Sequence, residues 1–353
     1  MKIKTVYMDI EEVLAQPVQQ HVYPKRPNIF FRMLLRAVSA PDLKATNFKY
    51  REFEMEKLGK KEPCLVLMNH SSFIDLKIAS TVLYPRPLNI VCTSDGFVGK
   101  ERLMRSLGCI PTRKFVTDTQ LVRDMMFALK KLKSSILMYP EASYTFDGTA
   151  TPLPAGLGKC VKLMGVPVVM IRTYGAFSRD PLYNGLRLRK VDVSADISYI
   201  LSPEDIRTKT AEDINGILYE QFSFDNFKWQ QENNVKISEP FRAEGLNRVL
   251  YKCPHCGAEG SMESGGADIL CNACGKGYTL TEYGFMEAKE GKTEFPHIPD
   301  WYAWERDCVR HEILKGSYKL DVPVDIYMMV NTRKVYGIGE GRLTHGETGF
   351  RLT

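Results

Sequence analysis

The sequence has no apolar run that approaches the roughly 20 residues of a membrane-spanning helix. Its first residues, MKIKTVYMDIEEVL, are too acidic and too polar for a secretory signal peptide. It also has no internal repeat and no low-complexity tract, which excludes a repeat architecture. We therefore expect a protein that does not span a bilayer and that works in the reducing cytoplasm.

The composition is that of an ordinary globular protein. Hydrophobic residues make up 44% and charged residues 25% of the 353 positions. This length accommodates one large domain and a smaller module. The net charge of +6 mildly favours anionic partners, either phospholipid headgroups or nucleic acid.

Apolar strands alternate with helices over much of the chain. Strands are predicted at 64–68, 88–92, 135–139 and 166–171, and helices at 73–83, 100–107, 120–133 and 158–164. A further strand, at 191–199, alternates apolar and polar residues as a half-exposed edge strand does. This alternation predicts an α/β fold, in which a mostly parallel sheet is flanked by helices.

A histidine and an aspartate follow closely after the first of these strands, at His70 and Asp75. A histidine at a strand end is held at the rim of the sheet, where it can meet a substrate. A nearby carboxylate fixes its tautomer and stabilises the imidazolium, as general-base catalysis on a hydroxyl requires. A structural alternative competes with this hypothesis, because Ser72 and Asp75 also have the spacing of a capping box.

The segment His70–Ser71–Ser72–Phe73–Ile74–Asp75 resembles the H-x4-D signature of the glycerophospholipid acyltransferase family. Three further blocks of that family follow in the same order, so that the resemblance covers roughly residues 25–225. They are Gly108–Cys109–Ile110–Pro111–Thr112–Arg113, Tyr139–Pro140–Glu141–Ala142–Ser143 and Val166–Pro167–Val168–Val169.

The resemblance implies an O-acyltransferase similar to the 1-acyl-sn-glycerol-3-phosphate acyltransferases. Its acyl donor would be acyl-CoA or acyl carrier protein, and its acceptor a hydroxyl of a lysophospholipid or of glycerol phosphate. By this resemblance His70 is the general base, and Asp75 orients it. The residues that the resemblance implies for substrate binding are Arg113, Glu141, Ala142 and Ser143.

Two residues depart from the third block of the family. Ala142 stands where the family usually has glycine, and Tyr144 where it usually has arginine. A guanidinium grips phosphate oxygens through paired hydrogen bonds, so the missing arginine removes one expected phosphate ligand. Arg113, with Lys114 beside it, is the candidate replacement; the alternative is an ordinary solvated basic pair.

Four cysteines form two C-x2-C-G knuckles, Cys253 with Cys256 and Cys271 with Cys274, separated by fourteen residues. This spacing is typical of a zinc ribbon, in which four thiolates hold a structural Zn²⁺. Two disulfides are the alternative, which a reducing compartment disfavours. Because four thiolates leave zinc no open coordination position, we expect no catalysis at this metal. His255, inside the first knuckle, is expected at the surface.

A candidate membrane-binding helix spans residues 28–38, after Pro27. Arg32 and Arg36 lie four residues apart, so their guanidinium groups can reach lipid phosphates together. Such a helix suits peripheral binding to an anionic membrane surface, here the cytoplasmic face. The alternative is a helix packed on its own domain. The apolar residues expected on one face are Phe30, Phe31, Leu34, Leu35 and Val38.

These signals divide the chain into four regions. Residues 1–24 are expected to be an N-terminal extension, 25–235 the acyltransferase-like domain and 236–290 the zinc ribbon with its flanks. Residues 291–353 have the alternation and the glycine-rich turns of a β-rich region.

Two other functions remain open at this stage. One is a catalytically weak zinc-ribbon platform that binds lipid or a protein partner. The other is a hydrolase or transacylase that uses the same His–Asp pair. Nucleic acid is not an expected partner, because the segment 262–268 between the knuckles is acidic.

Overall fold

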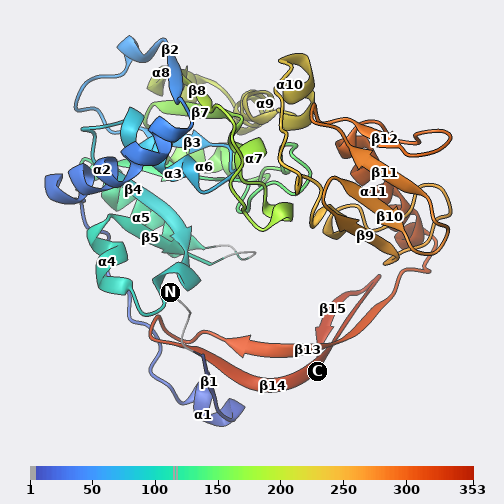
Figure 1. The fold of residues 1–353 in the computed structure, drawn as a ribbon. Coiled ribbons are helices and arrows are strands. Elements are labelled where there is room, and N and C mark those ends of the chain that lie inside the picture. Colours follow the sequence, from blue (N-terminus) through green and yellow to red (C-terminus); the bar gives the residue numbers. More distant parts are fainter. Residues whose placement is uncertain (1–4, 114–115, 117) are drawn as a thin grey trace.

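The computed structural model describes residues 5–113, 116 and 118–353, which form three sheets and their flanking helices (Figure 1). The largest sheet has seven strands. In spatial order they are β2 (Lys49–Phe53), β8 (Ser194–Leu201), β7 (Val168–Tyr174), β3 (Leu65–Met68), β6 (Ser135–Met138), β4 (Leu88–Thr93) and β5 (Cys109–Thr112).

This sheet is mostly parallel. The strands β7, β3, β6, β4 and β5 all run in one direction, whereas β8 is antiparallel to β7 and β2 is parallel to β8. The predicted fold class, a mostly parallel sheet flanked by helices, is confirmed. The stretch 191–199 was expected at an edge, but β8 lies inside the sheet. The edge strand is β2, whose polar and exposed sequence KYREF carries little strand signal.

Helices cover both faces of the sheet. The strand β3 shows why its sequence is apolar throughout: Val66 and Met68 pack into one core, and Leu65 and Leu67 into the other. The first core includes side chains of α2 (Ile29–Ala45) and α3 (Ile74–Val82). The second includes side chains of α5 (Thr119–Lys130), α6 (Leu157–Met164), α8 (Pro203–Thr208) and α9 (Ala211–Phe222).

Shorter helices complete this part of the chain. They are α1 (Ile10–Leu14), α4 (Glu101–Ser106), α7 (Ala176–Arg179) and α10 (Asn226–Glu232). In the part of the chain that the structure describes, no helix combines the length and the apolar character needed to cross a membrane.

The second sheet carries the cysteine knuckles. It is antiparallel, in the order β12 (Met286–Ala288), β11 (Gly277–Leu280), β10 (Asp268–Cys271) and β9 (Met262–Gly265). The helix α11 (Ile298–Leu314) packs against it through the fully buried Trp301, whose ring meets that of Tyr278 at 5.0 Å. This helix lies in the range 291–353 that the sequence predicted as β-rich, so only the part after it is β-structured.

The third sheet joins the two ends of the chain. The hairpin of β13 (Leu320–Met328) and β14 (Val335–Gly346) is extended by β15 (Gly349–Leu352), and β1 (Thr5–Tyr7) pairs in parallel with β14. The N-terminal extension and the C-terminal hairpin are therefore parts of one sheet.

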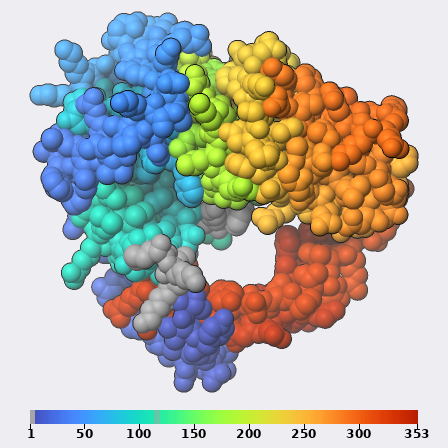
Figure 2. Space-filling view, in the orientation of Figure 1, coloured from blue at the N-terminus to red at the C-terminus, as the bar shows by residue number. Residues whose placement is uncertain are grey.

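The tip of this hairpin is fastened to the main domain. Thr332 donates a hydrogen bond of 2.6 Å to Glu101 at the start of α4, and its carbonyl accepts from the Gly99 amide at 2.9 Å. Asn331 donates to the carbonyl of Pro17 at 3.1 Å. The chain thus closes a ring, and Figure 2 shows the opening that it encloses.

Candidate active site

The loop after β3 places His70 at the edge of the sheet where the parallel strands end. Asn69 fixes this loop to the end of the neighbouring β7, because its Oδ1 accepts from the Thr173 amide at 2.9 Å. The carboxyl ends of parallel strands are where α/β sheets place their reactive groups. Tyr139 and Glu141 follow β6 at the same edge, so the first and third sequence blocks meet here.

His70 and Asp75 are in direct contact. The His70 Nδ1 lies 3.0 Å from Asp75 Oδ2, and the same oxygen accepts from the amides of Ser71 at 2.7 Å and Ser72 at 3.0 Å. Asp75 is completely buried, whereas the His70 side chain is 23% exposed. Because a carboxylate oxygen accepts hydrogen bonds, this contact fits the tautomer in which Nδ1 carries the proton and Nε2 keeps its lone pair.

The structure supports only part of the alternative in which Ser72 and Asp75 form a capping box. The helix α3 begins at Ile74, and its N-cap, Phe73, makes no side-chain capping bond. Ser72 Oγ accepts from the amide of Ile74 at 3.3 Å, and Asp75 binds the preceding amides as a cap would. Asp75 therefore organises the turn and also holds the imidazole.

Glu141 braces this loop. Its carboxylate oxygens accept from the His70 amide at 2.8 Å and from the Thr151 amide at 2.7 Å, and the residue is only 7% exposed. Burial raises the pKa of Glu141 to about 7, although the two amide bonds oppose this rise. Both oxygens are thus engaged with the backbone. The geometry favours a positioning role over the substrate contact expected from the sequence.

Two tyrosines enclose the His70 ring. Tyr139 stacks on it with ring centroids 4.1 Å apart, and Tyr144 lies on it at 4.2 Å with a tilt of 46°. Phe73 meets Tyr144 edge to face at 5.8 Å. Burial raises the pKa of both tyrosines, so each is a neutral phenol near neutral pH. No sequence pattern indicated these ring contacts beyond the departure at Tyr144.

The remaining predicted substrate residues lie in different surroundings. Ala142 is exposed and has a φ of 61°, the left-handed conformation that favours glycine, the usual residue of the family at this position. Ser143 is half-buried. The Arg113 side chain is 68% exposed, with its Nε 3.7 Å from Asp118. Lys114, its predicted partner, lies outside the described residues.

The space beside His70 is narrow and has no cationic lining. It measures ≈ 10 Å³, about the room of one water molecule. Among the described residues, no lysine or arginine lines it, and Arg113 is not part of its wall. The lining residues are Asn69, His70, Ser71, Glu141, Thr145, Thr149, Ala150, Phe222, Phe224 and Asn226.

A second buried carboxylate lies behind the Asp75 turn. Asp180 is 1% exposed and takes a 3.1 Å hydrogen bond from Arg179. Burial raises the pKa of Asp180 to about 6, whereas Arg179 and a hydrogen bond with Ser72 lower it. Asp180 is 108 residues away from Ser72 in the sequence, so no local pattern indicates their hydrogen bond.

Residues 50–173 match the family model described as Acyltransferase. Over these residues the chain is similar to the acyltransferase family. All four sequence blocks lie within the matched range. Comparison with curated proteins returns no match. Among solved structures, the 1-acyl-sn-glycerophosphate (LPA) acyltransferase PlsC from Thermotoga maritima has a TM-score of 0.44 at 15% identity, over 54% of this chain and 76% of that chain.

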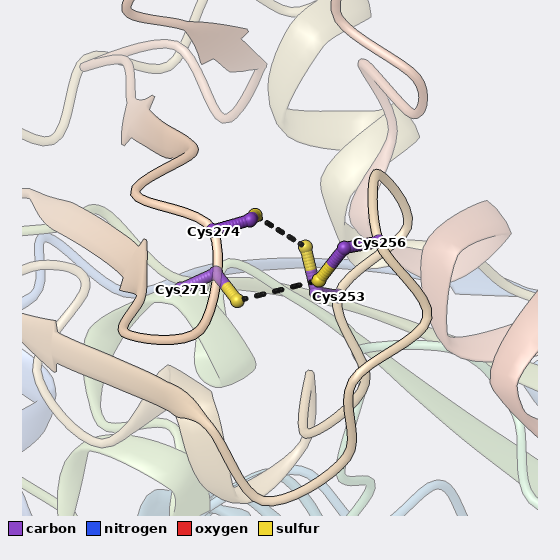
Figure 3. A group of neighbouring side chains, drawn as sticks. All are labelled: Cys253, Cys256, Cys271 and Cys274. Atoms are coloured by element: carbon purple, nitrogen blue, oxygen red, sulfur yellow. Dashed lines mark hydrogen bonds between the residues drawn. The ribbon is translucent and has the colours of Figure 1, made fainter.

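Outside the range that matches this family model, the four predicted metal ligands come together. The sulfur atoms of Cys253, Cys256, Cys271 and Cys274 all lie within 4.8 Å of one another (Figure 3). Cys253 and Cys274 are 3.8 Å apart, as are Cys256 and Cys271. Tetrahedral zinc with Zn–S bonds of about 2.3 Å requires sulfur atoms about 3.8 Å apart, so the cluster fits this metal.

The alternatives at this cluster do not fit the geometry. A disulfide needs sulfur atoms about 2 Å apart, far closer than these thiols, which are all unpaired. The side chain of His255 is 55% exposed and lies 3.2 Å from Glu294, away from the four sulfurs, as its predicted surface position requires.

Helix α11 supports the first knuckle from behind. The Lys252 amide donates to Glu305 Oε1 at 2.8 Å, and the Trp301 indole donates to the Lys252 carbonyl at 3.0 Å. These bonds hold the residue just before Cys253. The ribbon and α11 therefore form one packed unit.

Proposed function

We propose that the protein is an O-acyltransferase that moves a fatty acyl group from a thioester to a hydroxyl. The donor is acyl-CoA or acyl carrier protein, and the acceptor is a lysophospholipid or glycerol phosphate. The observation that carries this proposal is the His70–Asp75 pair within the range that matches the acyltransferase family, at the carboxyl edge of the sheet.

The reaction needs one base and no covalent intermediate on the protein. His70 Nε2 takes the proton of the acceptor hydroxyl while that oxygen attacks the thioester carbonyl. The new C–O bond forms, and the C–S bond breaks when the tetrahedral intermediate collapses. The imidazolium returns its proton to the departing thiolate. Asp75 stabilises the imidazolium between these two steps.

The serines beside His70 have other tasks. Ser71 Oγ accepts from the Asn69 amide side chain at 3.2 Å, and Ser72 Oγ accepts from the Ile74 amide. Neither hydroxyl is hydrogen-bonded to His70 in the described structure, as a serine nucleophile would need to be for its activation. Glu141 contributes indirectly, because it fixes the backbone at His70.

The four cysteines are proposed to hold a structural Zn²⁺ and to make residues 251–283 a zinc ribbon. When bound, the metal supplies stability and no chemistry, since four thiolates fill its coordination sphere. Cys253 and Cys271 are buried, whereas Cys256 and Cys274 are exposed.

The protein is further proposed to bind peripherally to the cytoplasmic face of a membrane through α2. Phe30, Met33 and Val38 are more than half exposed on this helix, at 63%, 55% and 61%. Phe31 and Leu35 instead line a small cavity against the end of α3. The outer face of α2 is thus the candidate for insertion, and it differs from the face expected from the sequence: Met33 belongs to it, whereas Phe31 and Leu35 do not.

Thiol release from acyl-CoA or from acyl carrier protein tests the proposal. We expect release that depends on a lysolipid or on glycerol phosphate, with the acylated lipid as product. Release that needs no acceptor would instead make the protein a hydrolase. A folded, metal-loaded protein that releases no thiol with any of these pairs would be a binding platform.

A further inference from the structure

A second groove lies at the opposite edge of the central sheet from His70. Its wall includes residues that lie one or two positions before three parallel strands: Pro63 before β3, Pro87 before β4 and Lys133 before β6. His70 follows the other end of β3. The groove measures ≈ 840 Å³, far larger than the space beside His70.

The charge of this groove is strongly one-sided. Its lining holds six cationic side chains and one carboxylate, that of Glu62, which leaves five net positive charges. The whole chain has a net charge of only +6. Outside this groove, the positive and negative charges of the chain therefore nearly cancel. The cations are Arg26, Arg32, Lys60, Lys61, Arg86 and Lys133.

Several of these cations are available to a ligand. Arg86 donates to the carbonyl of Gly59 at 3.1 Å, and Arg32 donates to that of Asn28 at 3.3 Å, so both are anchored. Lys60, Lys61 and Lys133 are exposed, and within the described part of the chain their side chains make no ion pair or hydrogen bond. Burial, and the neighbouring Arg26, lower the pKa of Arg32, which is consistent with crowding of positive charge.

The floor of the groove is apolar. Met55, Leu58 and Val82 contribute to it, together with the ring of Tyr84. Arg32 and Tyr84 also line the cavity beneath Phe31, so the groove is continuous with α2. The exposed apolar face of α2 begins at the same end of that helix, with Ile29 and Phe30. A ligand that joins an anionic group to an apolar group would match both the cationic residues and the apolar floor of the groove.

We infer that this groove binds the phosphate headgroup of an anionic phospholipid while the outer face of α2 inserts beside it. The lysines supply point charges to the phosphate oxygens, and the apolar floor receives the glycerol end of the lipid. The inference rests on the membrane contact proposed for α2, but not on the chemistry at His70. In Figure 1, α2 lies on the side of the molecule away from the ribbon.

Vesicle co-sedimentation of the full chain tests the groove. The vesicles are phosphatidylcholine alone or with 30% phosphatidylglycerol, and the variant is Lys60→Gln/Lys61→Gln/Lys133→Gln. At about fivefold per cation near an anionic surface, we expect a roughly 100-fold weaker partition to the phosphatidylglycerol vesicles. Partition to pure phosphatidylcholine should not change, and salt should erase the difference between the two proteins.

A matched variant removes the same charge elsewhere. Lys228, Lys292 and Lys315 lie on α10, near the ribbon and after α11, and their replacement by glutamine should weaken the partition much less. An equal loss in both triple variants would overturn the inference, because it would show general charge attraction. A groove variant that partitions like the unmodified protein, or an unmodified protein that binds neither vesicle, would overturn it too.

Two further readouts separate this inference from others. Thiol release with detergent-dispersed acceptor should stay within about twofold in the groove variant, since the groove lies away from His70. If that variant kept its vesicle binding but lost affinity for acyl carrier protein, the groove would be a docking site for that acidic protein, and the lipid assignment would be wrong. An unmodified protein that releases no thiol would contradict the proposed function, but it would leave the inference about the groove standing.

Discussion

The ring of Tyr144 covers the ring of His70, with their centroids 4.2 Å apart. Tyr139 also stacks on this imidazole, with centroids 4.1 Å apart, and Asp75 holds its Nδ1 at 3.0 Å. Tyr144 also occupies the position at which the resembled family usually has an arginine. No lysine or arginine lines the space beside His70 among the described residues, so an arginine in place of Tyr144 would add a cation next to the His70 ring.

Replacing Tyr144 with arginine should therefore change acceptor preference. A charge-assisted hydrogen bond contributes about 1.5–3 kcal/mol, so Tyr144→Arg should raise kcat/KM for lysophosphatidate roughly tenfold or more relative to lysophosphatidylcholine. Competition between the two acceptors measures this ratio directly. Tyr144→Phe is the matched control and should leave the ratio unchanged. An unchanged ratio in the arginine variant would place the acceptor phosphate elsewhere.

His70→Ala should reduce turnover by roughly 100- to 10,000-fold, because the attacking hydroxyl loses its base. Asp75→Asn should also be severe, since an amide does not stabilise the imidazolium as a carboxylate does. Initial rates of thiol release, together with circular dichroism, separate lost chemistry from lost fold. Ser71→Ala, one residue away, should stay within a few fold. Near-normal activity in a folded Asp75→Asn protein would show that Asp75 caps the helix and has no role in catalysis.

The buried carboxyl of Glu141 should titrate close to neutral pH. Its pKa is about 7 in the folded protein and about 4.5 when unfolded, so the folded state binds the proton more tightly. Its stabilising contribution is thus complete below pH 4.5 and is lost as the pH rises through about 7. The loss amounts to roughly 3 kcal/mol, at about 1.36 kcal/mol per pKa unit.

Carbon-13 NMR of the glutamate carboxyls checks this titration. One resonance should titrate near pH 7 and disappear in Glu141→Gln, while the resonance of Glu305, whose pKa burial raises to about 8, remains. The stability advantage of the unmodified protein over this variant in urea should shrink between pH 5.5 and 8. Glutamates that all titrate below pH 5 would contradict the prediction.

Zinc content should be about one ion per chain in freshly reduced protein. Cys253→Ser should lose the metal and unfold the ribbon locally, which exposes Trp301 and changes its fluorescence. Cys308→Ser is the control, because this cysteine lies on α11 outside the cluster. Elemental analysis counts the metal, and its absence from reduced protein would rule out the site.

Features that depend on contacts between neighbouring residues were predicted from local sequence patterns. His70 and Asp75 lie within one turn, and each cysteine knuckle spans four residues, so spacing alone brings these groups together. The apolar run of β3 likewise predicted a strand buried on both faces. In each case the residues that form the sequence pattern are also the residues that form the turn, the knuckle or the strand.

Contacts between distant segments had no such signal. Glu141 reaches the His70 amide across 71 residues, and Thr332 reaches Gln19 across 313. An acidic residue in a sequence block does not reveal which backbone amides its carboxylate will bind, so the sequence could not predict these two bonds of Glu141. The polar β2 was missed because its strand conformation depends on pairing with β8, not on its own pattern. Helix α11 was missed for a similar reason, because it depends on a distant contact. Its buried Trp301 packs on Tyr278, whereas in the sequence this tryptophan is only part of an aromatic cluster.

The membrane face of α2 gives the last prediction. Phe30 and Leu34 are 63% and 43% exposed, so Phe30→Ser/Leu34→Ser should leave the fold intact. Each inserted side chain contributes about 1.5–3 kcal/mol, and the pair should therefore lower partition to phosphatidylcholine vesicles at least roughly 100-fold. Phe31→Ser should instead destabilise the domain, because its ring faces the cavity beside α3. Arg36→Gln should only weaken binding to anionic vesicles, by about 1 kcal/mol.

Leu163→Ser is the control for this pair, because Leu163 is 52% exposed on α6, a helix of the opposite face of the sheet. It should partition like the unmodified protein. Co-sedimentation of the Phe30 and Leu34 variant at the unmodified level would show that α2 does not enter the bilayer. In that case the protein would have to meet its lipid through another surface, and the narrow space at His70 would have to open toward that surface.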